Sequence, residues 1–359
     1  MRAAVGRASF CARCDCSRTP PRPGVRLTLA RGAARRLPDL AVELSLQPWR
    51  AFGVDGVIMF SDILTPLPGM GIDFDILPGK GPLIPKPLRS LADIRATVRP
   101  MTDPASSHAF IGEILGSLRK ETDGKCTLLG FVGAPWTLAA YAIEGGSTKN
   151  CEHAKRMMFE APDALDALLE SITNSIIEYA SYQIRSGAQI MQLFDSWGQH
   201  LSPTQFVRFA KPFAERVTVE LQARHPGTPI IYFAHGSSGY LELQKDMSAD
   251  MLSLDWRCDM RTARRTLGAS VKVAGNIDPL ILFAPEPQIR AAVRQCIDDA
   301  GGRGHVLNLG APRPSTAGPA RRGARAGRAR RSLDAPVARR ARRAPLAPQG
   351  TGSCRGRPR

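Results

Sequence analysis

The chain has 359 residues, of which 43% are hydrophobic, so it is long enough for one large domain with a buried core. The formal net charge of +17 would by itself suggest a polyanion such as nucleic acid as a partner. That charge lies at the ends: residues 1–38 contain nine Arg and one acid, and residues 311–359 contain fourteen Arg and one acid. The body between them has 26 basic and 30 acidic residues, which argues against specific nucleic-acid binding.

The first 38 residues are rich in Arg, Ala and Ser and poor in acids, which is the composition of an organelle transit peptide. An unstructured or wrongly predicted end explains the same composition equally well. Cys11, Cys14 and Cys16 are spaced like half of a metal site, but no second half with matching spacing follows, so we expect no metal there. No apolar run reaches the roughly 18 residues that a membrane span needs, so no membrane partner is expected.

From Asp39 onward, short apolar runs alternate with amphipathic stretches. The apolar runs that predict strands are 56–60, 128–132, 189–194, 229–233, 251–254, 271–274 and 305–309. Examples of the helical stretches between them are 107–121, 162–186, 203–224 and 286–300. Apolar runs separated by amphipathic helices predict βα units and a parallel sheet.

This pattern predicts an α/β fold, namely a (β/α)8 TIM barrel that is incomplete at its ends, because only seven strands can be counted. A doubly wound sheet is the alternative, but no Gly-x-Gly-x-x-Gly follows the first strand. We expect the barrel to occupy residues 39–310. Beyond Gly310 the chain is almost entirely Arg, Ala, Pro and Gly, so residues 311–359 are predicted to form a basic, disordered tail.

Nearly every predicted strand ends in a polar or Gly/Pro cluster. These clusters lie at 61–62, 133–136, 195–197, 235–237, 255–256, 275–279 and 308–310. Because the carboxyl ends of the strands surround one mouth of a parallel barrel, we expect the functional site at that mouth.

Five polar residues in or near these clusters are candidates for the site. Asp62 is placed to face a cation, with capping of the next turn as its alternative role. Tyr141 carries a hydroxyl that can donate to a carboxylate, unless it only packs on a helix face. Ser196 is favoured as a binding hydroxyl because no Gly-x-Ser-x-Gly elbow surrounds it. His235 ends a strand and is a candidate for the mouth, whereas His305 opens one and is expected to be structural.

Taken together and in order, these motifs resemble the uroporphyrinogen decarboxylase family over about three quarters of the chain. The matching stretches are Pro-Asp-Leu-Ala-Val-Glu-Leu-Ser-Leu-Gln-Pro-Trp-Arg-Ala-Phe (38–52), Phe-Ser-Asp-Ile-Leu (60–64), Gly-Lys-Gly-Pro (79–82), Phe-Val-Gly-Ala-Pro-Trp-Thr-Leu (131–138), Glu-Gly-Gly (144–146), Gly-Ala-Gln (187–189), Leu-Asp-Trp (254–256), Gly-Asn-Ile-Asp-Pro (275–279) and Asn-Leu-Gly (308–310). Each stretch alone is weak, whereas the ordered set is specific. The sequence of the first matching stretches is most similar to that of plant, algal or cyanobacterial members of the family.

The resemblance implies a carboxy-lyase that converts the four acetate arms of uroporphyrinogen III into the methyl groups of coproporphyrinogen III, in heme and chlorophyll biosynthesis. It implies no cofactor and no metal. Asp62 would be the catalytic carboxylate that faces the pyrrole N–H groups and stabilises the positive charge of the protonated ring. Tyr141 and Ser196 would bind substrate, and Phe131, Phe194 and Ile58 would line the macrocycle pocket.

The chain departs from the family pattern at both ends. The family's Arg-Gln-Ala-Gly-Arg motif, whose arginines hold substrate carboxylates, is absent, and Asn308-Leu309-Gly310 continues into Ala-Pro-Arg where the family has His-Gly. Both changes coincide with Arg-rich sequence of the kind that results when a GC-rich coding sequence is read out of frame. We therefore expect resequencing of the transcript to change both ends, and we expect low activity from the chain as it stands.

The resemblance also implies a homodimer with facing mouths. The similarity to family members from photosynthetic organisms and the acid-poor N-terminal segment favour a location in the chloroplast, with the cytoplasm as the alternative. Two other classes of protein remain open. A corrinoid or methyl-transfer relative would hold zinc through a His-x-Cys motif, which this sequence lacks. A polyanion-binding protein would act through its Arg-rich ends, and its binding would be sensitive to salt.

Overall fold

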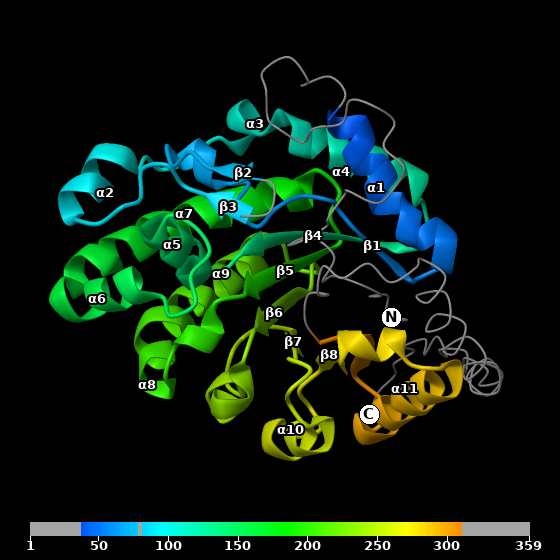
Figure 1. Cartoon of the computed structure of the whole chain (residues 1–359). Coiled ribbons are helices and arrows are strands. Elements are labelled where there is room, and N and C mark those ends of the chain that lie inside the picture. Colours follow the sequence, from blue (N-terminus) through cyan, green and yellow to red (C-terminus); the bar gives the residue numbers. More distant parts are fainter. Residues whose placement is uncertain (1–36, 78–80, 311–359) are drawn as a thin grey trace, which may run out of the picture.

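The computed structural model describes residues 37–77 and 81–310 (Figure 1). The predictions for residues 1–38 and 311–359 fall outside these ranges, except that Leu37 and Pro38 begin helix α1 (Leu37–Phe52). In the part of the chain that is described, no helix combines the length and the apolarity needed to cross a membrane.

All seven predicted strands are present, shifted by at most a few residues. They are β1 (Gly56–Ile58), β4 (Thr127–Gly133), β5 (Ile190–Asp195), β6 (Ile230–Ala234), β7 (Met251–Ser253), β8 (Val273–Ile277) and β9 (His305–Leu309). They pair in chain order, and every pairing is parallel. A doubly wound sheet reverses its order at a switch point. The uninterrupted order, and the curl of the sheet in Figure 1, therefore confirm an incomplete (β/α)8 barrel.

The helices surround this curled sheet. Those that connect or cover its strands are α1, α4 (Ala109–Glu121), α5 (Pro135–Glu144), α7 (Pro162–Arg185), α9 (Lys211–Arg224), α10 (Met260–Leu267) and α11 (Glu286–Asp299). Shorter helices are α2 (Leu91–Thr97), α3 (Pro104–Ser107), α6 (Glu152–Glu160) and α8 (Pro203–Gln205). Figure 1 shows α7 and α9 side by side on the outside of β4, β5 and β6, so these strands are covered by helices.

The predicted helix 203–224 is interrupted in the structure. A π-helical turn, η4 (Phe206–Ala210), separates α8 from α9, and Pro212 follows it in the first turn of α9. Proline has no N–H to donate to the preceding turn, so the wider turn forms where the regular helical hydrogen bond is lost. A second difference is the hairpin of β2 (Asp75–Leu77) and β3 (Gly81–Leu83), which lies outside the main sheet and is too short to show an alternating pattern.

Strand β4 shows how the barrel interior is separated from the helical layer. A Cβ atom on Gly130 would lie 2.6 Å from the side-chain oxygen of Gln183 in α7, so position 130 faces the helices. Since successive side chains of a strand alternate, Phe131 faces the interior. Gln183, fully buried, accepts from the N–H of Phe131 over 3.0 Å and donates to its carbonyl over 2.8 Å. It replaces the pairing that the three-residue strand β1 is too short to provide.

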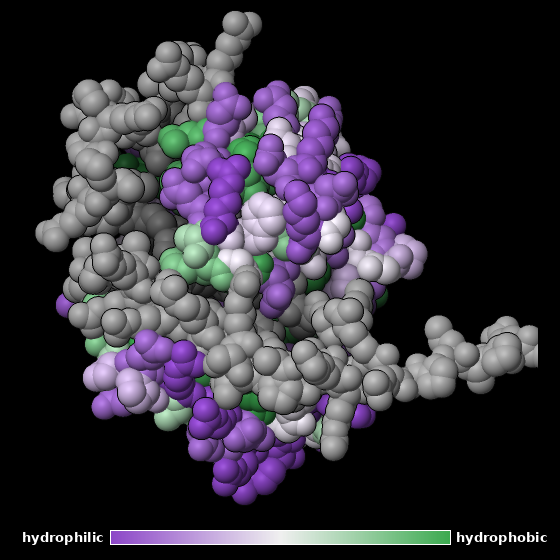
Figure 2. All heavy atoms as spheres, turned by 90° about the vertical axis from the view of Figure 1, so that its right-hand side faces the viewer, coloured by the Kyte–Doolittle hydropathy of each residue, from purple (hydrophilic) through white to green (hydrophobic). Residues whose placement is uncertain are grey.

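The outer surface is polar where helices face solvent. Figure 2 shows hydrophilic side chains gathered over α1 and α4 in the upper part of that face and over α11 in the lower part. On the other side of the molecule, three Arg–acid pairs join α7 to the segment formed by η4 and α9, with Arg208 in η4 and the other two arginines in α9. These pairs are Arg208–Asp166, Arg216–Glu170 and Arg224–Glu178. They are partly exposed, so packing of the apolar faces beneath them contributes most of the stability of this layer.

Candidate functional site

Polar side chains gather at the carboxyl ends of the strands, as predicted for a barrel mouth. Asp62 follows β1, Ser196 follows β5, His235 follows β6 and Asp255 follows β7. Asn276 lies within β8. Strand β1 and the four consecutive strands β5 to β8 thus each place a polar group at the same edge of the sheet.

Asp62 lies in the loop after β1, half-buried. Its Oδ1 atom accepts a hydrogen bond of 2.8 Å from the N–H of Leu64, so the predicted turn-capping role is present. The described part of the chain provides no hydrogen bond to Oδ2. Burial raises the pKa of Asp62 to about 6, and the bond from Leu64 opposes this shift. The hydrogen bond to Oδ1 therefore fixes the carboxyl group in the loop.

His108 holds the loop that carries Asp62 by a hydrogen bond to its backbone. The Nε2 atom of His108 lies 2.8 Å from the carbonyl of Thr65, and Nδ1 lies 2.8 Å from the hydroxyl of Ser107. Because a carbonyl only accepts, Nε2 carries the proton and Nδ1 accepts from Ser107. The ring is almost fully buried against Tyr179, with centroids 5.3 Å apart. Sequence reasoning missed His108, because no local pattern connects it with a loop 43 residues earlier.

A row of aromatic rings crosses the strands at the mouth. Phe131 and Phe194 meet edge to face with centroids 5.6 Å apart, and Phe194 meets Phe233 in the same way at 5.9 Å. The imidazole of His235 is stacked beyond Phe233 at 6.3 Å. Two of the predicted pocket residues are therefore in contact, and the row extends past them. The third, Ile58, ends β1 and is half-buried against the core.

Tyr141 and Ser196 come from different elements of the same region. Tyr141 lies on α5, and its ring packs on that of Trp197, with centroids 4.1 Å apart. Trp197 is held by a bond of 3.1 Å from the indole of Trp136 to its carbonyl. Ser196, half-buried, immediately precedes Trp197. Asp62 belongs to the neighbouring loop, since the carbonyl of Ile63 lies 3.3 Å from the position of a Cβ on Gly133, at the end of β4.

Beneath Ser196 lies a buried carboxyl group. Asp195 accepts from the hydroxyl of Thr137 over 2.6 Å and from the phenol of Tyr232 over 2.9 Å. Thr137 in turn accepts from the N–H of Trp197 over 3.1 Å. Burial raises the pKa of Asp195 to about 6, and the two hydroxyl donors oppose that shift. Asp195 is enclosed by protein, so its role is to hold the end of β5 in position for the residues that follow it.

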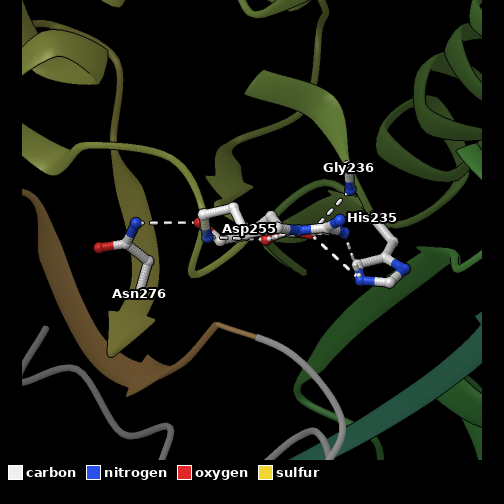
Figure 3. Close-up of polar contacts among 5 residues, drawn as sticks. His235, Gly236, Asp255 and Asn276 are labelled. Carbon is white, nitrogen blue, oxygen red and sulfur yellow. Dashed lines mark hydrogen bonds and ion pairs between the residues drawn. The ribbon is translucent and has the colours of Figure 1, made fainter. Parts of the chain in front are cut away.

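On the opposite part of the mouth, His235, Asp255 and Arg257 form a second polar cluster. Figure 3 shows His235 and the N–H of Gly236 pointing toward the carboxylate of Asp255. Asp255 is fully buried and lies 3.3 Å from Nε2 of His235. Although burial raises the pKa of Asp255, hydrogen bonds from Arg257 and Gly236 outweigh it and hold that pKa below its usual value. His235, a candidate for the mouth, lies directly after the carboxyl end of β6.

Two further residues close the back of this cluster. Asn276 donates over 2.9 Å to the backbone carbonyl of Asp255 and also to that of Cys258, so its amide holds the loop after β7 (Figure 3). His305, at the start of β9, lies with Nε2 2.7 Å from the carbonyl of Gly275. That contact with a neighbouring strand is the structural role expected of His305.

Other features of the described residues lie away from this mouth. A hollow of about 400 Å³ opens between the 100–102 loop, α7 and α9, and it contains none of the predicted site residues. Within residues 37–77 and 81–310, no group of three or more His, Cys, Asp or Glu side chains is arranged to hold a metal ion.

The fold and the mouth define a (β/α)-barrel with a polar and aromatic site at the carboxyl ends of its strands. Similarity to solved structures supports the fold alone. A methyltransferase from Methanosarcina mazei superposes with a TM-score of 0.71 at 17% identity, covering 84% of this chain and 87% of that one. A B12-independent methionine synthase from Shewanella sp. gives a TM-score of 0.58 at 12% identity, covering 86% and 91%.

Sequence similarity identifies the family. The sequence model of the uroporphyrinogen decarboxylase (URO-D) family matches residues 30–320. The chain is 52% identical to a uroporphyrinogen decarboxylase of Picosynechococcus sp. over 273 residues, which are 76% of this chain and 77% of the relative. Relatives of the same name from Synechocystis sp. and Nostoc punctiforme are each 50% identical, with the same coverage. The chain therefore belongs to the uroporphyrinogen decarboxylase family.

Proposed function

We propose that this chain is a uroporphyrinogen decarboxylase, which removes CO2 from the four acetate arms of uroporphyrinogen III to give coproporphyrinogen III. The observation that carries the proposal is the family membership over three quarters of the chain. The position of Asp62 after β1 at the mouth, with Oδ1 held by the N–H of Leu64, supports it. The reaction serves porphyrin biosynthesis, from which heme and chlorophyll derive.

Each decarboxylation converts one CH2–COO⁻ arm and one proton into a methyl group and CO2. The bond to the carboxyl carbon breaks heterolytically, so its electron pair needs an acceptor. A pyrrole ring protonated on carbon provides that acceptor, and the electrons return to the ring as CO2 leaves. The arm is then protonated to the methyl group as the ring loses its added proton.

In this proposal, Asp62 stabilises the positive charge of the protonated ring and accepts hydrogen bonds from pyrrole N–H groups. A negative charge fixed in a partly buried site stabilises such a cation more strongly than solvent does, because it needs no reorganisation during the reaction. The bond from Leu64 to Oδ1 keeps the carboxylate oriented before substrate arrives.

The remaining predicted residues bind the macrocycle. Phe131, Phe194 and Ile58 provide the apolar surface for the ring system, and the edge-to-face contact of the two phenyl rings keeps that surface fixed. Tyr141 and Ser196 donate hydrogen bonds to carboxylate arms, with the Tyr141 ring held by Trp197.

The direct test is to express the full chain and incubate it anaerobically with uroporphyrinogen III. After oxidation to porphyrins, chromatography separates species with eight, seven, six, five and four carboxyl groups. We expect slow, Asp62-dependent loss of carboxyl groups that EDTA does not inhibit. Complete absence of species with fewer than eight carboxyl groups, from a folded preparation, contradicts the proposal.

Three further expectations belong to the same proposal. The chain acts as a homodimer with facing mouths, which sedimentation at micromolar concentration tests. It is placed in the chloroplast, with the cytoplasm as the alternative, which imaging of a tagged full-length chain tests. The catalytic domain extends over residues 39–310, and resistance of a fragment of that length to limited proteolysis tests this boundary.

A further inference from the structure

Arg257 is a cation that the protein holds in place while leaving it partly exposed. Its Nε and Nη2 atoms donate to the carboxylate of Asp255 over 3.2 and 3.1 Å. The same carboxylate accepts from the backbone N–H of Arg257 over 2.8 Å and from that of Gly236 over 2.7 Å. Because Asp255 is fully buried and fixed by two backbone donors, it is a rigid support for the guanidinium.

His235 provides a second support for the guanidinium. Nη2 of Arg257 lies 2.9 Å from Nε2 of His235. A guanidinium has donors only, so Nε2 accepts, and the imidazole is neutral with its proton on Nδ1. Burial lowers the pKa of His235, and Arg257 lowers it further, while Asp255 and a backbone hydrogen bond to Ser196 oppose the shift. The neutral ring therefore positions Arg257 without adding a charge.

One edge of the guanidinium remains unused. Nε and Nη2 make the contacts just described, whereas no hydrogen bond within the described ranges involves Nη1. The side chain of Arg257 is 43% exposed. Its guanidinium carbon lies 5.8 Å from the ring centroid of Trp256, which is itself 40% exposed. The exposed part of the residue is thus a pair of N–H donors beside an accessible aromatic ring, at the carboxyl end of β7.

This cation stands at the end of the aromatic row. Phe131, Phe194, Phe233 and His235 follow one another across β4, β5 and β6, and His235 is the ring that contacts Arg257. A flat macrocycle lying on that row would extend its carboxylate arms past the row's end. Because Asp255 offsets the charge of Arg257 at long range, recognition there would depend on short hydrogen bonds from Nη1.

We propose that Arg257 binds a carboxylate arm of the substrate through Nη1, and that Asp255 and His235 are positioning residues for it. This inference rests on the decarboxylase function proposed above, because it assigns one residue's role in recognising that polycarboxylate substrate. It adds a binding cation that the sequence patterns did not indicate.

The test uses the full chain and measures both binding and turnover. Binding is followed by the fluorescence of uroporphyrin, the oxidised octacarboxylate, and turnover by loss of carboxyl groups from uroporphyrinogen. We expect Arg257→Gln to weaken uroporphyrin binding by about 10- to 100-fold, the cost of one charge-assisted contact. KM should rise more than kcat falls. The effect should be smaller for a porphyrin with only two carboxylates.

Arg265→Gln is the matched control, because it replaces Arg with Gln at an exposed position of α10. There Nη2 of Arg265 donates to the hydroxyl of Thr262. Equal weakening by both variants, or unchanged binding by a folded Arg257→Gln variant, overturns the proposal. Should Arg257→Gln fail to fold, Arg257→Lys decides, because it keeps a charge beside Asp255 but lacks the fork. Unchanged uroporphyrin binding by Arg257→Lys then overturns the proposal.

The positioning role of His235 has its own signature. The side chain in His235→Gln offers an oxygen to Nη2 of Arg257, whereas the side chain in His235→Leu does not. We expect His235→Gln to bind uroporphyrin nearly as well as the unaltered chain, and His235→Leu to bind it several-fold more weakly. Equal affinity of the two variants contradicts that role.

Failure of the inference and failure of the proposed function give different results. A chain that binds uroporphyrin through Arg257 but never releases CO2 contradicts the decarboxylase proposal and leaves Arg257 as a carboxylate-binding residue. An Arg257→Gln chain that decarboxylates uroporphyrinogen as well as the unaltered chain supports the function and overturns the inference.

Discussion

His108 donates a hydrogen bond of 2.8 Å from Nε2 to the backbone carbonyl of Thr65, and so connects the start of α4 to the loop that carries Asp62. The ring is nearly fully buried, and the pKa of His108 is lowered by burial while the bond to Thr65 opposes this shift. A neutral histidine thus helps to fix the position of the loop that carries Asp62, through a hydrogen bond to the backbone of Thr65.

Replacing His108 with Ala should therefore lower kcat without removing any group from the mouth. We expect about a 10- to 100-fold loss, because displacing a catalytic group by about 1 Å has effects of that size. Decarboxylation assays measure it. His153→Ala on the exposed face of α6 is the control, and equal activity of the two variants would show that the loop needs no support from His108.

Replacing Asp62 with Asn should separate activity from stability. Loss of the negative charge is expected to lower kcat by about 100- to 1000-fold, the size of effect seen when one preorganised electrostatic group is removed. The amide oxygen of Asn still accepts from Leu64, so the turn should stay intact. Retention of more than a tenth of the activity by a folded Asp62→Asn chain would refute the catalytic role.

The same substitution should make the protein more stable at neutral pH. The pKa of Asp62 is raised from 3.8 to about 6 in the folded chain, so the protonated form is favoured by folding. Its contribution to stability is complete below about pH 4 and is lost as pH rises through 6. At pH 7.5, Asp62→Asn should raise the free energy of unfolding by about 1–2 kcal/mol, after allowance for partial exposure. Urea titrations at pH 4 and 7.5 measure the difference, which should shrink at the lower pH.

Activity should have the opposite dependence on pH. Only the ionised carboxylate can offset the charge of a protonated pyrrole, so kcat/KM should decline as pH falls through about 6. Rates between pH 5 and 8 at constant ionic strength test this, on a preparation whose circular dichroism is unchanged over the range. A flat profile would assign the raised pKa to a group without a role in catalysis.

Tyr232→Phe should destabilise the fold from within. It removes the phenol that donates to Asp195 and leaves a fully buried carboxyl group one donor short. We expect the free energy of unfolding to fall by about 1–3 kcal/mol, the usual cost of an unsatisfied buried polar group. Tyr182→Phe, at a more exposed hydroxyl 3.4 Å from the carbonyl of Ala109, should change it far less. Denaturant unfolding compares the two, and equal losses would show that Asp195 does not need Tyr232.

The order of elements and the position of Asp62 could be predicted from the sequence, and the supports of the site could not. Strands buried on both faces are continuous apolar runs, and the polar residue that ends such a run falls at the mouth whatever its partners are. His108 and Arg257 have no such signal. His108 acts on Thr65, 43 residues away, and Arg257 contacts His235, 22 residues away, so their roles exist only once the strands are adjacent.

The interrupted helix before α9 and the short hairpin illustrate the other limit of sequence patterns. The apolar spacing of residues 203–224 continues through Pro212, so periodicity predicts one helix, although the missing N–H of proline changes the hydrogen bonding there. Strands β2 and β3 have three residues each, fewer than an alternating pattern needs to be recognised.

The hydrogen bonds of Gln183 to Phe131 also limit how far β1 can run. A longer β1 would pair Met59 and Ser61 with the same N–H and carbonyl of Phe131, and the Gln183 amide already occupies both. On the other edge, the N–H of Phe60 donates to the hydroxyl of Ser45 over 2.7 Å, which satisfies it without a strand. The side chains of Gln183 and Ser45, both from helices, thus take the hydrogen bonds that a longer β1 would use. The chain continues as a loop just before Asp62, so a glutamine from the helical layer outside the barrel helps to set where the Asp62 carboxylate lies at the mouth.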